Sequence, residues 1–276
     1  MIPRREIIDR LTAAAEPLYG TGEARQIARM ILEARTGTTL TQMVTEPDGE
    51  VEFDDIDSVA AEIAAGRPVQ YVLGETEFCG MSFFVGEGVL IPRPETEELT
   101  MRVTATHPKS IIDIGAGIGC IAVSLAKMLP EAEVWAVDLS AEALGYARQN
   151  AERLGADVKF VHADALAMPD LGRRFDVVVS NPPYIPRSEE AGMRLNVTGY
   201  EPKMALFVED SDPLLFYREI VRQAGTMLDK GGRLWFEVHE RFAGEVAELL
   251  AYKDFDCVEI FSDINDKPRI VCGRKR

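Results

Sequence analysis

The stretch IIDIGAGIG, Ile111–Gly119, decides the fold of this chain. Its apolar half is typical of a strand that is buried on both faces of a parallel sheet. Its glycines permit positive φ angles and let backbone amides approach a ligand without a Cβ in the way. A helical pattern that carries Ile121, Ser124 and Leu125 comes next. The stretch therefore predicts a first strand, a ligand-binding turn and a helix.

Strand and helix patterns alternate from Ser110 onward, which is the rhythm of βαβ units in an α/β fold with a parallel sheet. The expected strands are Ile111–Ile114, Val134–Asp138, Val158–Val161, Val177–Val179 and Leu234–Val238, with a helix at Ala141–Leu154. Two further apolar runs, Cys257–Phe261 and Ile270–Cys272, are too close together for a crossover helix. We therefore expect them to form a closing antiparallel hairpin.

Acidic residues stand at the ends of three successive strands. Asp113 would repel a pyrophosphate and would suit the cationic tail of an amino acid. Asp138 can accept hydrogen bonds from both ribose hydroxyls, and Asp164 can accept one from an adenine amino group. Each acid alone could instead be a helix cap or a surface charge, and a Gly-x-Gly-x-Gly turn also occurs in nicotinamide and flavin folds. Together they favour S-adenosylmethionine, which carries a sulfonium and an ammonium, as the cofactor.

The tetrapeptide Asn181–Tyr184 follows the apolar run Val177–Val179 directly after Ser180. Two successive prolines end a strand abruptly because neither can donate to a ladder. The Asn amide and the Tyr ring therefore stand at the carboxyl end of a strand, where open α/β sheets bind their ligands. A stiff turn that Asn caps and Tyr packs against is the alternative, and we place the chemistry here instead.

The chain from Arg5 to about Gly66 has a helical pattern. Two apolar stripes with i, i+3, i+4, i+7 spacing are Ile27, Met30, Ile31, Ala34 and Ile56, Val59, Ala60, Ile63. We interpret this part as a small helical domain that docks a partner, with a stabilising appendage as the alternative. The runs Gln70–Gly74, Phe78–Val85 and Val89–Ile91 predict short strands around Gly86-Glu87-Gly88, as in a hairpin.

The chain has 276 residues and a net charge of −16, which disfavours bare DNA or RNA as a partner because phosphate binding calls for a basic face. The amino terminus has no apolar region of a signal peptide, and no run approaches the length of a membrane span. We expect a cytoplasmic protein with no membrane partner. Its four cysteines are scattered without spacing that suggests zinc, and we expect no metal site.

The sequence resembles the HemK/PrmC family, the N5-glutamine methyltransferases that modify class I peptide chain release factors. The matching motifs are Arg67–Gly74, Leu90–Glu97, the glycine turn after Asp113, Asn181–Tyr184, and Tyr200-Glu201-Pro202 with Ala205-Leu206. The resemblance implies a helical domain over residues 1–74, a β-hairpin linker over 75–94 and a Rossmann-like seven-stranded class I methyltransferase domain over 95–276. It also implies a release factor as protein partner, and we expect a monomer.

The family's site residues carry over by position. For the cofactor they are Asp113, Gly115, Ala116, Gly117, Ile118, Gly119, Asp138, Asp164, Ala165 and Asn181. For the substrate glutamine they are Asn181, Pro182, Pro183 and Tyr184, with Asn181, Pro182 and Tyr184 assigned to catalysis. Three features depart from the family pattern: Ala165 in place of an aromatic residue, Ile118 in the glycine turn, and Phe207–Asp210 in place of a glycine-rich stretch.

We expect the Asn181 side-chain oxygen and the Pro182 carbonyl oxygen to hold the two N–H groups of the substrate amide, while Tyr184 stacks on its plane. The loop Ile185–Lys203 would close over the target, with Arg187 and Arg194 either holding it or only adding solubility. His162 and His239 are interpreted as structural or surface residues. Two rival functions are an N6-adenine methyltransferase acting on DNA or RNA, which would use the same tetrapeptide, and a cofactor-binding module without catalysis.

Overall fold

The computed structural model describes all residues from Met1 to Arg276. The chain divides into two compact units. The first comprises Met1–Glu75 and Met193–Tyr200, and the second comprises Thr76–Gly192 and Glu201–Arg276. No helix in the chain is both long enough and apolar enough to cross a membrane.

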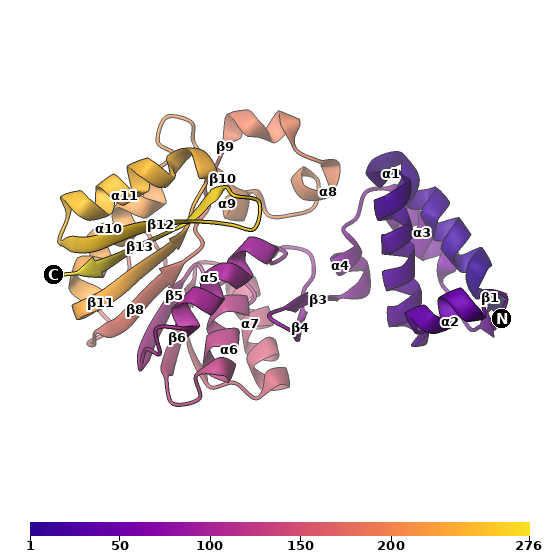
Figure 1. Cartoon of the computed structure of the whole chain (residues 1–276), viewed down its shortest axis with the longest axis horizontal. Helices are drawn as coiled ribbons and strands as arrows, with labels where there is room; N and C mark the ends of the chain where they lie inside the picture. The colour runs from indigo at the N-terminus through magenta and orange to yellow at the C-terminus, as the bar shows by residue number, and fades with distance from the viewer. The chain divides into compact units, whose positions relative to one another are not determined.

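The first unit is mainly helical (Figure 1). Its elements are β1 Ile2–Pro3, α1 Arg4–Thr36, α2 Leu40–Thr45, β2 Glu50–Val51, α3 Ile56–Ala64, α4 Val69–Leu73 and, from the later segment, α8 Leu195–Thr198. Gly20 has φ 73° and ψ 162°, so α1 consists of two helices that meet at this residue. The strands β1 and β2 pair antiparallel.

The buried face of α1 differs in part from the expected stripe. Ile27 and Ile31 are buried, but Met30 and Ala34 are exposed. The same i, i+3, i+4, i+7 spacing also fits a stripe that starts at Ala24, and this is the one that packs into the core. The spacing indicates a helix, but it does not determine which face of the helix is buried when further apolar residues lie next to the stripe on both sides. In α3 the expected face is confirmed, since Ile56, Val59 and Ile63 are buried.

A hairpin follows the first unit, but its turn is not where the sequence predicted it. Strands β3 Glu75–Phe78 and β4 Met81–Phe84 are joined by Cys79 and Gly80, whose φ angles of 50° and 71° are both left-handed. Two such residues are typical of the tight turns that suit the twist of a hairpin. The predicted turn at Gly86–Gly88 is therefore wrong, and the predicted strand at Gln70–Gly74 is instead helix α4 with Gly74 as its left-handed cap.

The second unit is a seven-stranded sheet with helices on both faces. Its main elements are α5 Pro94–Thr104, β5 Ser110–Ile114, α6 Cys120–Met128, β6 Glu133–Asp138, α7 Ala141–Leu154, β7 Val158–His162, β8 Phe175–Ser180, α10 Leu215–Met227, β11 Leu228–Glu237, α11 Ala243–Tyr252, β12 Phe255–Ser262 and β13 Pro268–Lys275. The shorter ones are β9 Ile185–Pro186, α9 Lys203–Leu206, β10 Phe207–Val208 and 3₁₀ turns at Arg187–Gly192 and Glu240–Phe242.

The strand order is β12-β13-β11-β8-β5-β6-β7. The pairs among β11, β8, β5, β6 and β7 are parallel, and β13 is antiparallel to both of its neighbours. This confirms the α/β class, the seven strands and the closing hairpin. Chain order runs from β5 to β6 on one side and jumps to β8 on the other, so a topological switch point lies at the carboxyl end of β5.

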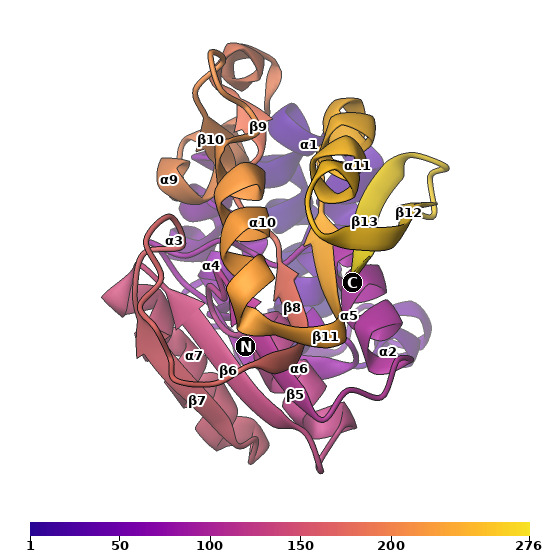
Figure 2. The same ribbon diagram turned by 90° about the vertical axis from the view of Figure 1, so that its left-hand side faces the viewer.

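The two faces of the sheet are covered by different helices. Helices α10 and α11 cover one face, and α5, α6 and α7 cover the other (Figures 1 and 2). Because side chains alternate along a strand, Ile112 and Ile114 point into the core under α10 and α11. Asp113 points to the opposite face, towards α6. The core therefore holds β5 rigidly and leaves its carboxyl end free for a site.

Candidate active site

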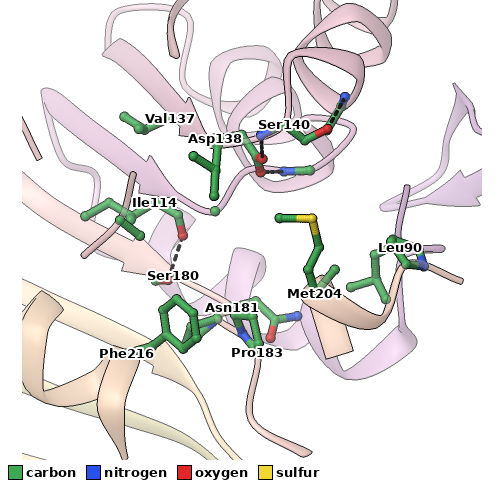
Figure 3. A pocket seen from close by; sticks show the side chains of 18 of the residues that line it. Leu90, Ile114, Val137, Asp138, Ser140, Ser180, Asn181, Pro183, Met204 and Phe216 are labelled. Carbon is green, nitrogen blue, oxygen red and sulfur yellow. Dashed lines mark hydrogen bonds between the residues drawn. The ribbon is translucent and has the colours of Figure 1, made fainter. Parts of the chain in front are cut away.

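A cavity opens at the carboxyl ends of β5, β6 and β8, within the second unit (Figure 3). The space between its walls is about 860 Å³, which includes space open to solvent. The predicted site residues that line it are Gly115, Gly117, Asp138, Asp164, Ala165, Asn181, Pro182 and Pro183. The structure thus brings together residues that follow or end four strands, β5, β6, β7 and β8.

The other predicted residues do not line the cavity. Ala116 and Ile118 are buried within the glycine turn, and Asp113 is fully buried beneath it. Gly119 starts α6 with φ 82°, and a Cβ there would lie 3.1 Å from the Cβ of Ala147. Its role is therefore to let the helix pack closely.

The glycine turn is tied to the end of β6. The backbone N–H groups of Gly115 and Ala116 both donate to the Val137 carbonyl, at 2.8 and 2.9 Å. The N–H of Gly117 donates to Asp138 Oδ2 at 2.8 Å. Gly115 and Gly117 have φ angles of 80° and 57°, which side chains other than glycine rarely adopt. The turn depends on its glycines for this conformation.

Asp138 is held at the cavity by two backbone amides. Its Oδ1 accepts from the N–H of Ser140 at 2.8 Å, and its Oδ2 accepts from Gly117. A carboxylate has about four lone-pair sites, so each oxygen keeps capacity for one further donor. This arrangement fits a carboxylate that receives two hydroxyls of a ribose. Figure 3 places Asp138 and Ser140 on one side of the cavity, with Asn181 and Pro183 on the other.

Asp113 is the most unusual acid in the chain. It has no exposed surface, and neither carboxylate oxygen makes a hydrogen bond of good geometry, although the backbone N–H of Ala122 is close enough to oppose the rise of its pKa. Burial raises its pKa to about 8, because removal from water penalises the charged form. An orphaned buried carboxylate directly behind a ligand-binding turn is suited to a cation, which is the chemistry that S-adenosylmethionine brings.

The loop after β7 also lines the cavity. Asp164 accepts a hydrogen bond from the N–H of Leu166 at 2.8 Å, which fixes its carboxylate at the cavity. Gln223 of α10 donates to the carbonyl of Ala165 at 2.8 Å and accepts from the N–H of Met168 at 2.9 Å. The loop is thus held both by its own Asp164 and by Gln223 of helix α10.

Asn181 and Tyr184 belong to one hydrogen-bond network with two residues, Thr96 and Glu237, that the sequence analysis did not assign to the site. Asn181 Nδ2 donates to Thr96 Oγ1 at 3.2 Å, and Tyr184 Oη donates to Glu237 Oε1 at 2.9 Å. Thr96 in turn donates to Glu237 Oε2 at 2.6 Å. Burial raises the pKa of Glu237, while the two hydrogen bonds and the nearby Arg269 oppose that rise. Tyr184 lies beside the cavity, edge-on to His239 at 6.1 Å.

Strand pairing and ion pairs hold the segment that follows the tetrapeptide. Strand β9 pairs in parallel with β10, where buried Phe207 and Val208 explain the departure from a glycine-rich stretch. Arg187 pairs with Glu209 at 2.6 Å. Further along, Arg194 pairs with Glu23 at 2.9 Å, inside the first unit. Both arginines are therefore engaged in ion pairs.

His162 and His239 serve local structure, as the sequence suggested. His162 Nε2 hydrogen-bonds the Leu139 carbonyl at 2.7 Å, and His239 caps the 3₁₀ turn at Glu240–Phe242.

Sequence reasoning missed several residues of the cavity wall. They are Gly88, Val89, Leu90, Leu139, Ser140, Met204, Ala205, Phe216 and Ile220, among others. Ser140 had a detectable signal, because it directly precedes the predicted helix at Ala141 and caps it by accepting from the N–H of Ala143. Phe216 had none, since it is one apolar residue on an amphipathic helix. It supplies an aromatic ring to the cavity in which Ala165 has replaced the expected one.

Two family models match the chain. Residues 4–74 match the PrmC N-terminal domain, and residues 95–196 match the methyltransferase small domain. A protein named release factor glutamine methyltransferase, from Flavobacterium psychrophilum, is 39% identical over 270 residues, covering 94% of both chains.

Solved structures share the fold of the second unit. A methyltransferase from Pyrococcus furiosus aligns with a TM-score of 0.55 and 18% identity, covering 71% of this chain and 90% of that one. The 16S rRNA N2 G1207 methyltransferase of T. thermophilus, in complex with AdoMet and guanosine, aligns with a TM-score of 0.51 and 18% identity, covering 73% of this chain and 50% of that one. At these identities the likeness is one of fold.

Proposed function

The chain belongs to the family of release factor glutamine methyltransferases, and on that premise we propose that it methylates a glutamine side chain in class I peptide chain release factors. The methyl group passes from S-adenosylmethionine to the amide nitrogen N5. The observation that carries this proposal is the Asn181 amide, held by Thr96 at the wall of a cavity that is also lined by Asp138 from the end of β6 and Asp164 from the loop after β7.

The cavity fits the cofactor by the chemistry of its residues. S-adenosylmethionine supplies a methyl group on a positively charged sulfonium, which makes that methyl electrophilic. Asp138 has free lone pairs for the ribose hydroxyls, and Asp164 for the adenine amino group. Asp113 lies buried beneath the glycine turn with a pKa of about 8, so it is largely protonated at neutral pH without ligand, and the ammonium of the methionine tail would favour its ionised form.

The chain's main task towards the substrate is to orient a weak nucleophile. A carboxamide nitrogen is a weak nucleophile because its lone pair is delocalised into the carbonyl. Asn181 Oδ1 accepts one N–H of the substrate amide and the Pro182 carbonyl oxygen accepts the other, so the lone-pair face turns to the cavity. Such positioning contributes about 7–11 kcal/mol at most.

The proton on the nitrogen becomes acidic only once the methyl group has arrived. The chain therefore needs no general base beforehand, and Asn181 Oδ1 and the Pro182 oxygen hold the two N–H groups until one proton leaves to water. Tyr184 supports the geometry through its bond to Glu237, and its ring limits the space beside the amide.

The helical region over residues 1–74 is the part that we assign to docking the release factor. The hairpin linker over 75–94 joins it to the methyltransferase domain over 95–276. We propose that the protein acts in the cytoplasm as a monomer, without binding nucleic acid directly. The net charge of −16 supports the last point, because it opposes approach to a polyphosphate.

The experiment that tests this proposal uses S-adenosylmethionine labelled in its methyl group. The protein is incubated in parallel with a class I release factor, with the same factor carrying Gln→Ala at the labelled position, and with DNA and RNA. We expect label on the intact factor alone. Label on nucleic acid and not on the factor would favour the N6-adenine alternative, which the comparisons do not favour, and label on neither would leave a binding module.

A further inference from the structure

We propose that Thr96, held by Glu237, is a positioning residue that determines which end of the Asn181 amide faces the cavity. This inference rests on the proposed function, because it concerns how Asn181 presents an acceptor to the substrate amide. Thr96 and Glu237 lie on α5 and β11, and neither lines the cavity itself.

The geometry is a chain of three hydrogen bonds. Asn181 Nδ2 lies 3.2 Å from Thr96 Oγ1, and Thr96 Oγ1 lies 2.6 Å from Glu237 Oε2. The other oxygen of Glu237 accepts from Tyr184 Oη at 2.9 Å. Thr96 and Glu237 are 2% and 1% exposed, so water does not compete for these positions.

The direction of each bond follows from counting protons. Burial opposes the ionised form of Glu237, whereas the bonds from Thr96 and Tyr184 and the nearby Arg269 favour it. With Glu237 ionised the carboxylate only accepts, so both neighbouring hydroxyls donate to it. A hydroxyl carries a single hydrogen, and Thr96 commits it to Glu237. Thr96 can therefore only accept from Asn181, and it must meet the NH₂ group. The side-chain oxygen of Asn181 is left to face the other way.

This polarity matters because an amide group has nearly the same shape in both orientations. Packing alone would tolerate the flipped form of Asn181, in which NH₂ would face the NH₂ of the substrate glutamine. Two donors would then meet, and the substrate amide would lose the acceptor that orients its lone pair. Thr96 prevents the flip because the flipped amide would set its oxygen against a hydroxyl that has no hydrogen left to give.

The decisive variant is Thr96→Val, which keeps the shape of the side chain and removes the hydroxyl. We expect kcat for methylation of the release factor to fall by on the order of 10²-fold, as for a misplaced catalytic group. The dissociation constant for S-adenosylmethionine, measured by calorimetry, should stay close to that of the wild type. Thr96→Ser restores the hydroxyl and should restore kcat.

A matched control lies one helical turn away. Thr100 is also buried, and its hydroxyl donates to the Thr96 carbonyl at 2.9 Å without reaching Asn181. Thr100→Val loses a comparable buried hydrogen bond, so we expect a similar shift in melting temperature with kcat close to the wild type. Equal kcat values for Thr96→Val and Thr100→Val would overturn the inference.

A second variant covers the case in which Thr96→Val does not fold. Glu237→Gln replaces one acceptor oxygen by an NH₂ group, so at least one of the two hydroxyls of Thr96 and Tyr184 loses its acceptor. Thr96 is then no longer required to act only as an acceptor towards Asn181. We expect a loss of kcat without loss of cofactor binding, and unchanged kcat in this variant would also overturn the inference. A wild-type protein that leaves the release factor unlabelled would instead refute the proposed function, so the two failures are distinguishable.

Discussion

Asn181 is the residue on which the proposed mechanism depends most directly. We expect Asn181→Ala to reduce methylation of the release factor by at least about 10²–10³-fold, the range seen when one preorganised polar group is removed from an active site. Cofactor binding should persist, because Asp138 and the glycine turn keep their contacts. Radiolabel transfer and calorimetry measure the two quantities, and near-normal turnover would remove Asn181 from the mechanism.

Protonation of Asp113 should make the free energy of unfolding depend on pH. Its pKa is about 8 in the folded protein and near 3.8 when unperturbed, so across that interval the unfolded chain has released a proton that the fold retains. The stability that this group contributes is therefore fully present below about pH 4 and is lost as the pH rises through about 8.

The variant Asp113→Asn has no such proton, so its free energy of unfolding relative to the wild type should increase from about pH 5 to about pH 8. Urea titrations without cofactor test this, and a constant difference would contradict it. If Asp113 receives the cofactor's ammonium, the same variant must also bind S-adenosylmethionine more weakly. A more stable chain with weaker binding would show that the buried charge serves the ligand and not the fold.

At the scale of elements, the strands and their ends could be predicted because the signals are local. A buried parallel strand is a contiguous apolar run, and the residue after it lies at the ligand edge, as for Asp138 and Asn181. Thr96 and Glu237 could not be found this way, because Thr96 is 85 residues from Asn181 and meets it only through the fold. The hairpin turn was missed because Cys79 adopts a positive φ, and cysteine is not a residue type from which a positive φ is expected.

Helix α7 shows how one polar side chain joins separate elements. Asn150 is fully buried, accepts from the N–H of Phe84 at 2.6 Å, and donates to the carbonyls of Phe84 and Ile118 at 3.1 and 3.0 Å. It thereby links strand β4 to the glycine turn. The bond that holds the glycine turn at this position is made by the backbone carbonyl of Ile118 and not by its side chain.

We expect Asn150→Ala to lower the free energy of unfolding by about 1–3 kcal/mol, because one buried and two part-buried backbone groups lose their partner. The cofactor should also bind more weakly, since the glycine turn loses a support. The exposed neighbour Gln149→Ala is the control, with a change within about 0.5 kcal/mol. Chemical denaturation of both variants decides the matter, and equal stabilities would mean that β4 is held by its packing alone.

At the scale of the whole molecule, a segment that follows the tetrapeptide Asn181–Tyr184 in the chain belongs again to the first unit. The segment Met193–Tyr200 belongs to the helical unit, where Tyr200 Oη donates to the Ala65 carbonyl at 3.0 Å. The next residue, Glu201, belongs to the second unit and accepts from Ile91 N–H at 3.0 Å and from Arg93 at 2.6 Å. The loop that follows the tetrapeptide is thus shared by both units through chain connectivity.

This sharing predicts that loosening the segment affects the protein substrate more than the cofactor. Tyr200→Ala removes one partly exposed hydrogen bond, worth about 0.5–1.5 kcal/mol, so KM for the release factor should rise by up to about tenfold. The affinity for S-adenosylmethionine should not change, because no cavity residue is altered, and proteolysis between Arg187 and Tyr200 should be faster. Tyr252→Ala is the control, since Tyr252 is 86% exposed on α11. An unchanged KM together with faster proteolysis would mean that the segment orders the loop without contributing to recognition of the release factor.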